Sequence, residues 1–189
     1  MAFGIEIIIA SVFGLVGVGI IVYFVSIFNG LIRLRRNIDK SWANIDVILK
    51  QRHDELPKLI EVCKGYMKYE KSVLKDLTEL RSKWMSASSL SDKAEVSNQI
   101  SAALKSLFAV AESYPQLKAN ESFLQLQTRI SGLENELADR REFYNDSVNT
   151  YNIRIKSIPD MWIAGTMHYQ PIDMFKVTEE EKKDVNIKF

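Results

Sequence analysis

Residues 5–28 read IEIIIASVFGLVGVGIIVYFVSIF, and this stretch decides how the chain is organised. Glu6 is the only residue in it that is charged at neutral pH. As a helix it would be about 36 Å long, more than the roughly 30 Å of hydrocarbon in a bilayer. It lacks the basic start, the short apolar run and the small-residue cleavage site of a signal peptide, and core helices are rarely apolar on all sides for so long. The stretch therefore predicts a transmembrane helix.

The charges on either side of this stretch predict its orientation. No Lys or Arg precedes it, whereas four cations follow it closely: Arg33, Arg35, Arg36 and Lys40. By the positive-inside rule, residues 1–4 lie outside a cell (inner or plasma) membrane that the chain crosses once, and residues from about 33 lie in the cytoplasm. The same four cations are candidates for contact with anionic lipid headgroups.

Composition limits what the rest of the chain can be. The 189 residues allow one spanning helix and one further domain of about 150 residues. A net charge of +1 indicates no nucleic-acid partner. The lone cysteine, Cys63, cannot form an internal disulfide and fits a reduced, cytoplasmic domain. A catalytic role for it is disfavoured, because His53 and His168 are the only histidines that could serve as its base.

Beyond the membrane stretch, apolar residues recur at alternating steps of three and four, the pattern of amphipathic helices in a bundle. We expect an all-α fold in which residues 33–159 form an antiparallel up-and-down bundle of three to four long helices. The first helix should run from the membrane to about Met85. Pro57 either breaks it after Leu56 or kinks it, and the unbroken phase of the pattern over residues 49–67 favours the kink.

The remaining boundaries follow from caps and prolines. A turn at 86–91 precedes a helix that begins at Asp92 and ends near Tyr114, just before Pro115. Asn120 or Ser122 should cap the longest helix, which Pro159 stops. The apolar seam of this helix passes through Arg140, and two consecutive steps of four form a stutter from Arg140 to Val148. We expect the stem of Arg140 to be buried and its charge to meet a carboxylate or carbonyl of a facing helix, with Glu61, Glu70, Asp76 and Glu112 as candidates.

The C-terminal residues 160–189 form a tail that we expect to pack on the bundle. Residues 161–175 are too apolar for free disorder and should lie along the bundle around a short helical turn. Residues 178–183 have the composition of a solvated or weakly helical end. Residues 185–189 alternate apolar and polar, which would allow them to dock as an extended strand.

None of the usual catalytic motifs occurs in the sequence. It contains no glycine-rich phosphate loop, no His-Glu-x-x-His or cysteine-pair zinc pattern, no Glu-x-x-His pair of the di-iron type and no Gly-x-Ser-x-Gly elbow. The sequence therefore predicts no enzyme activity, no metal and no cofactor.

Three motifs carry a resemblance to a known family. They are residues 39–59 (DKSWANIDVILKQRHDELPKL), 111–127 (AESYPQLKANESFLQLQ) and 141–155 (REFYNDSVNTYNIRI). In this order they resemble the LemA family, and the likeness covers essentially the whole chain. It implies a membrane-anchored antiparallel helical bundle with its N-terminus outside and the bundle in the cytoplasm, and it implies no particular activity. The departures, Cys63, Trp84 and residues 159–162, bear on packing.

Two places are candidates for binding a partner. Tyr144-Asn145 and Tyr151-Asn152 are seven residues apart and so lie on one helix face. They either satisfy one another and the backbone inside the bundle, or form a polar groove, with Arg140 or Arg141, Arg52 and Asp46, that takes a partner segment. The second place is the loop 114–120, since loops on a rigid scaffold often carry recognition; its candidate residues are Tyr114, Pro115, Lys118 and Asn120.

The anchor and the missing motifs together favour a non-catalytic membrane scaffold or adaptor that binds other envelope proteins or itself as a homo-oligomer. The alternative is a membrane-surface or remodelling protein that acts through oligomers and anionic lipid. An enzyme or small-molecule sensor would need a pocket around Arg140 to Tyr151.

Overall fold

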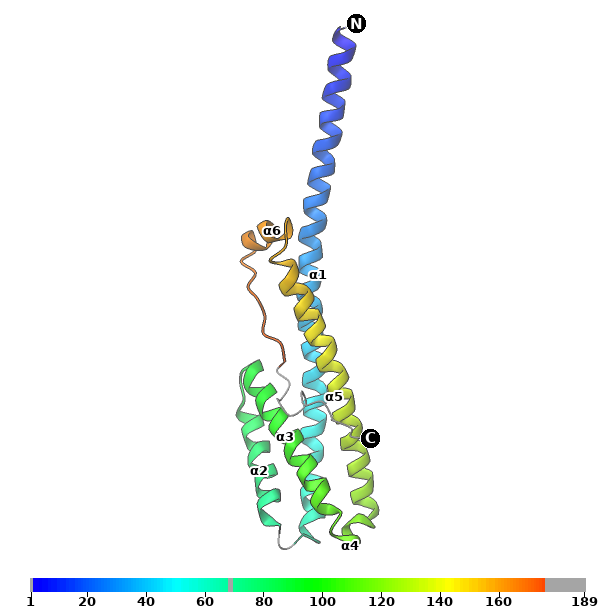
Figure 1. Ribbon diagram of the computed structural model, residues 1–189, viewed down its shortest axis with the longest axis vertical. Coiled ribbons are helices and arrows are strands. Elements are labelled where there is room, and N and C mark those ends of the chain that lie inside the picture. Colours follow the sequence, from blue (N-terminus) through cyan, green and yellow to red (C-terminus); the bar gives the residue numbers. More distant parts are fainter. Residues whose placement is uncertain (1, 68–69, 176–189) are drawn as a thin grey trace, which may run out of the picture. The chain divides into compact units, whose positions relative to one another are not determined.

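The computed structural model describes residues 2–67 and 70–175, and this part of the chain is helical with no strand (Figure 1). The predicted all-α class is confirmed. The helices are α1 (Ala2–Lys64), α2 (Lys71–Ser86), α3 (Leu90–Ala111), α4 (Pro115–Lys118), α5 (Glu121–Arg154) and α6 (Asp160–Thr166).

The chain divides into two compact units. The first unit comprises Met1–Ser41 and Asn145–Met174, and the second unit comprises Trp42–Tyr144 and Phe175–Phe189. Because α1 and α5 are long, each contributes residues to both units. The predictions for residues 178–183 and 185–189 lie outside the described residues.

Helix α1 is continuous through Pro57, so the chain does not break after Leu56. The expected extension to Met85 is wrong, because α1 ends at Lys64 and α2 begins at Lys71. The backbone N–H groups of residues 66 and 67 both donate to the carbonyl of Cys63 and close the last turn. The periodicity of apolar residues did not reveal this connection, because Met67 and Leu74 are seven residues apart, a spacing that also suits one unbroken helix.

Capping side chains set the starts of the next helices. The Ser89 hydroxyl accepts a hydrogen bond from the Asp92 N–H at 3.0 Å, so α3 begins at Leu90, two residues before the predicted start. The Asn120 Oδ1 accepts from the Phe123 N–H at 2.9 Å, which confirms Asn120 as the cap of α5. Helix α5 ends at Arg154, ahead of the position where Pro159 was expected to stop it.

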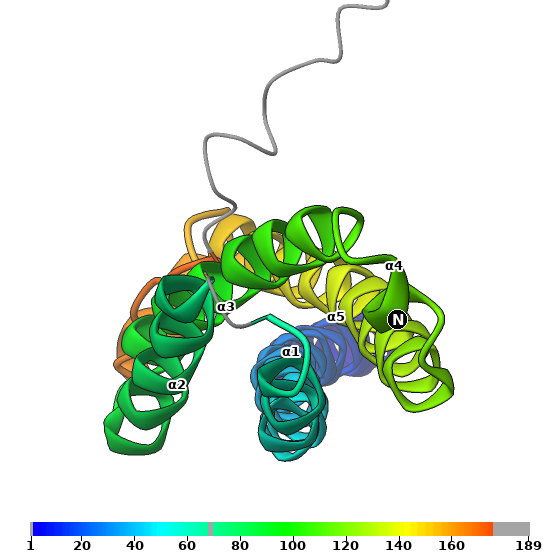
Figure 2. The same ribbon diagram turned by 90° about the horizontal axis from the view of Figure 1, so that it is seen from below.

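The core of the second unit draws apolar side chains from α1 through α5. Seen from below, α2, α3 and α5 form an arc beside the C-terminal end of α1 (Figure 2). The side chains at its centre are buried and include Leu56, Leu59, Cys63, Met67, Leu74, Leu77, Ile100, Leu104, Leu107, Leu117, Phe123 and Ile130. Burial of this apolar surface is the main force that holds these helices together.

The first unit combines a small buried cluster with a long exposed apolar helix. Leu31 and Ile38 of α1 are buried, as are Tyr151 and Ile155 at the end of α5 and beyond it. The N-terminal part of α1 contains a window of mean hydropathy 2.6, none of which is buried, and this helix is long and apolar enough to cross a membrane.

Candidate functional site

A polar layer lies inside the second unit around Arg52, whose side chain is 1% exposed. Its Nη1 donates to the Ser101 Oγ at 2.9 Å and to the Glu134 Oε1 at 2.5 Å. Its Nη2 donates to the Ser97 Oγ at 2.7 Å and to the Ser97 carbonyl at 3.2 Å. The guanidinium of α1 is thereby bound to both α3 and α5, and a buried charge requires such pairing.

Arg141 extends this layer toward the C-terminal segment. Its Nη2 donates to the Ser97 Oγ at 2.7 Å, and its guanidinium lies 4.3 Å from the ring centroid of Phe175. The Trp42 ring lies 6.1 Å from Phe175 and 5.8 Å from Tyr144. Phe175 of the chain itself therefore packs against Arg141 and Trp42, where the groove hypothesis puts a segment of a partner.

The expected place of Arg140 in the seam is wrong. Arg140 is exposed and forms an ion pair of 3.1 Å with Glu136 on its own helix. The seam passes through Arg141, since Leu137 and Tyr144 on either side of it are buried. Glu112, one of the candidate partners of Arg140, pairs with Lys118 instead. Asp46, a member of the predicted polar groove, pairs with Lys93 at 2.7 Å.

Sequence reasoning missed Ser97, Ser101 and Glu134 as partners of Arg52. The available signal was on α3, where Ser97 and Ser101 are four residues apart and both buried, beside the apolar seam. Small hydroxyl residues at this spacing on a buried helix face indicate a polar partner on a neighbouring helix.

The second Tyr-Asn pair holds the C-terminal segment of the first unit. The Asn152 Nδ2 donates to the Ile172 carbonyl at 2.8 Å, and the Ile172 N–H donates to the Asn152 Oδ1 at 2.9 Å. The Tyr151 hydroxyl donates to the Gln170 carbonyl at 3.2 Å. Burial raises the pKa of Tyr151, and the charge of nearby Arg35 opposes that rise. These contacts favour the structural interpretation for Tyr151 and Asn152, while Tyr144 is buried and Asn145 half-buried.

Most of the segment 114–120, which the sequence predicts to be a loop, is the short helix α4, and the residues at its start form one wall of a pocket in the second unit. The pocket has a volume of about 340 Å³ and is lined by Tyr66, Ser113, Tyr114, Pro115, Gln116 and Leu117. The Asn120 Nδ2 donates to the Tyr66 hydroxyl at 3.1 Å and so ties the end of α1 to the loop. The structure thus brings Tyr114 and Pro115 together in a concave surface, with Asn120 behind it.

Burial shifts the pKa of two side chains of the second unit, Cys63 and His53. Burial raises the pKa of the Cys63 thiol to about 11, which leaves it protonated at neutral pH. Burial, and secondarily the charge of Arg81, lower the pKa of His53, whose ring lies 4.5 Å from that of Trp84. Within residues 2–67 and 70–175, no cluster of three or more His, Cys, Asp or Glu side chains could hold a metal ion.

The basic residues after the apolar stretch belong to the first unit. Arg33, Arg36 and Lys40 are exposed. Arg35 is less free, because it lies beside the Tyr151 hydroxyl and is 3.7 Å from the Asp39 carboxylate.

Comparison with known proteins agrees with the three motifs. A sequence profile described as the LemA family matches residues 41–189. The chain belongs to the LemA family. Protein LemA of Metamycoplasma hominis is 28% identical over 186 residues, which cover 97% of this chain and 84% of that protein. Magnetosome protein MamQ 2 of Paramagnetospirillum magneticum is 32% identical over 74 residues, 39% of this chain and 27% of that protein. MamQ of Magnetospirillum gryphiswaldense is 29% identical over 73 residues, which cover 39% of this chain and 27% of that protein.

The structure shows what each of the three LemA motifs contributes to the fold. The first supplies Arg52, the centre of the buried polar layer. The second supplies the wall of the pocket, and the third supplies Asn152, which binds the backbone of the C-terminal segment. Two of the three LemA motifs therefore contribute internal contacts, and the second contributes a concave surface.

Proposed function

We propose that this LemA protein is a non-catalytic, membrane-anchored helical scaffold or adaptor. Residues 5–28 cross the cell membrane once, with residues 1–4 outside. Residues 33–159 form an antiparallel up-and-down helical bundle in the cytoplasm, with the tail 160–189 packed on it. The bundle binds another envelope protein or a second copy of the chain.

The exposed apolar helix is the observation that carries this proposal. Its Ile, Leu, Val and Phe side chains between residues 5 and 28 are mostly more than half exposed. At their mid-membrane values these side chains together favour insertion by about 5–9 kcal/mol. The same surface in water would be a large aggregation-prone patch, so a bilayer is the environment that suits it.

The pocket beside the loop 114–120 supports partner binding. Tyr66 and Tyr114 are among the residues that line it, and aromatic residues in a concave site are typical anchors for a bound side chain. The polar groups around Arg52, in contrast, are hydrogen-bonded to one another. A docking role therefore fits the second unit better than catalysis does.

A photo-crosslinking amino acid at Gln116 tests this role in full-length protein in its native membrane. Gln116 is exposed and lines the pocket. The matched control is Asn135, an exposed polar residue of α5. We expect a discrete crosslinked product from position 116 and none from position 135. Equal or absent crosslinking at both positions, in protein that remains in the membrane fraction, would refute partner binding at the pocket.

A membrane-surface role is the second candidate, and the exposure of Arg33, Arg36 and Lys40 favours it. Each cation near an anionic surface contributes at most about 1 kcal/mol. Purification of the full-length protein in lipid nanodiscs, followed by lipid analysis, tests this role. Replacing the three residues by Ala should reduce the enrichment of anionic lipid around the protein. Unchanged enrichment would exclude a specific lipid role for this cluster.

A further inference from the structure

The turn after α5 and the outer face of α6 expose a group of large apolar side chains. Ile158 is 72% exposed, Trp162 is 59% exposed and Met161 is 41% exposed; we call these three residues the 158–162 patch. The opposite face of α6 is covered, since Asp160 and Ala164 are buried. Helix α6 is therefore apolar on the side that it turns away from its own unit, where a water-facing helix would be polar.

Within the first unit, the contacts of Arg154 show which part of α1 lies near the start of α6. Its Nε donates to the Asp160 Oδ2 at 2.6 Å, at the first residue of α6. On its other side, a methyl group added at Gly30 would lie 3.3 Å from the Arg154 Nη1. Gly30 follows Phe28, the end of the apolar stretch, by two residues, or about 3 Å of helix rise. The Arg154 side chain thus connects the start of α6 with the part of α1 that would leave the hydrocarbon.

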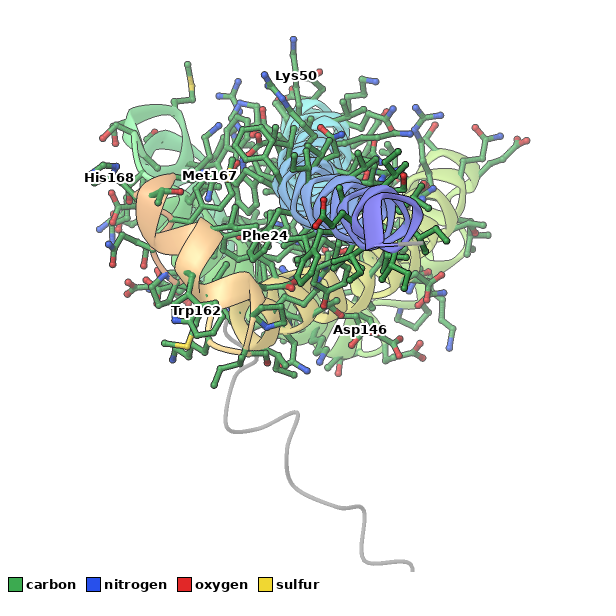
Figure 3. The ribbon with its side chains drawn as sticks, turned by 90° about the horizontal axis from the view of Figure 1, so that it is seen from above. Phe24, Lys50, Asp146, Trp162, Met167 and His168 are labelled. Atoms are coloured by element: carbon green, nitrogen blue, oxygen red, sulfur yellow. The ribbon has the colours of Figure 1, made fainter. Side chains whose placement is uncertain are left out.

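The chemistry of the patch matches that level. Tryptophan, with an apolar ring system and one N–H donor, is enriched where hydrocarbon meets the headgroups. Trp162 lies on α6 in the view down the axis of α1 (Figure 3). The side chains of residues 5–28 and those of the patch are both mostly apolar and exposed, and the charges of Arg154 and Asp160 compensate each other.

We propose that the 158–162 patch inserts among the lipid headgroups of the leaflet from which residues 5–28 emerge. The occupant of this apolar face is then a lipid surface, and the chain holds the membrane at two places. This inference rests on the proposed function, because it needs residues 5–28 to span the bilayer. A seven-residue helix can enter only the boundary between headgroups and acyl chains, so the second contact is shallow.

Tryptophan fluorescence of the full-length protein in nanodiscs tests the contact. The chain has three tryptophans, and Trp42 and Trp84 are half-buried residues of the second unit. Phosphatidylcholine that carries bromine either near the headgroups or near the bilayer centre serves as the quencher. We expect shallow bromines to quench the wild type more strongly than deep ones. Trp162→Phe should abolish most of that quenching, whereas the control Trp84→Phe should retain it.

The outcomes separate the patch from the anchor. If the protein elutes with nanodiscs but Trp162→Phe leaves the quenching unchanged, or the wild type is not quenched, the lipid contact is wrong and the anchor stands. Crosslinking of position 162 to a second copy or another protein, without quenching, would assign the patch to that partner instead. If the protein does not elute with nanodiscs, the anchor itself fails. Because Trp162 is largely exposed, the Phe variant should keep its helix content by circular dichroism.

Discussion

Replacing Arg52 by Met should destabilise the second unit by about 3 kcal/mol. The variant keeps an apolar stem but removes the bonds to Ser97, Ser101 and Glu134. Breaking a buried pair by deleting one partner costs about 3–5 kcal/mol. The lower end applies because the Glu134 side chain is 26% exposed and water can hydrate its carboxylate once it is alone.

Thermal and urea unfolding of the full-length protein in detergent measure this loss. For a chain of 150–250 residues, such as this one of 189, a loss of 3 kcal/mol corresponds to a fall in Tm of roughly 6–12 °C. The double variant Arg52→Met/Glu134→Met should recover much of the stability, since it leaves no unpaired buried charge.

The matched control is Arg140→Met, which breaks a pair whose side chains are each 48% exposed and should change stability by at most about 0.5 kcal/mol. If Arg52→Met costs no more than Arg140→Met, or if the double variant is less stable than Arg52→Met alone, the buried layer does not have the role assigned to it.

Three further predictions concern other parts of the chain. Asn152→Ala removes two hydrogen bonds of about 1 kcal/mol each to Ile172, so hydrogen exchange at the Ile172 amide should accelerate by at least about 10-fold; the exposed Asn149→Ala should leave that rate unchanged. His53 has a lowered pKa in the folded state, so the unfolded state takes up the proton first. Its contribution to stability is therefore complete above the unfolded pKa of 6.5 and is lost as the pH falls through the folded value. Urea unfolding between pH 7.5 and 5.5 should show this decline in the wild type and less of it in His53→Gln; equal slopes would contradict the burial of this ring. The Cys63 thiol, with its pKa near 11, should react with iodoacetamide at pH 8 roughly 100-fold more slowly in folded than in urea-unfolded protein, and comparable rates would show that it is accessible.

Some boundaries were predictable because they depend on local chemistry. Asn is a preferred residue at the N-cap, where its side-chain oxygen accepts a hydrogen bond from a free backbone N–H of the first turn, and Asn120 does so. A short helical turn was expected in the apolar segment after Pro159, and α6 is found there. The end of α1 was not predictable from periodicity, because the apolar positions on both sides of the connection stay in phase.

The choice between Arg140 and Arg141 shows where periodicity stops being sufficient. Arg140 is three residues after Leu137 and four before Tyr144, whereas Arg141 is four after and three before, so spacing alone left the two arginines nearly equivalent. Packing placed Arg141 inward, where Ser97 accepts its hydrogen bond and Phe175 covers it. Ser97 is far from Arg141 in the sequence, and no local pattern around either residue signals the other.

The sequence by itself determined an all-helical chain, an apolar N-terminal helix of membrane-spanning length and the three LemA motifs, because composition and period are properties of neighbouring residues. Only the tertiary structure decided that Arg52 is hydrogen-bonded to α3 and α5, that Asn152 binds the backbone of the C-terminal segment, and that Trp162 stays exposed on the helix whose first residue pairs with Arg154. These outcomes depend on which distant residues meet when the helices pack, and a buried polar group takes whichever partner that packing brings within hydrogen-bond reach.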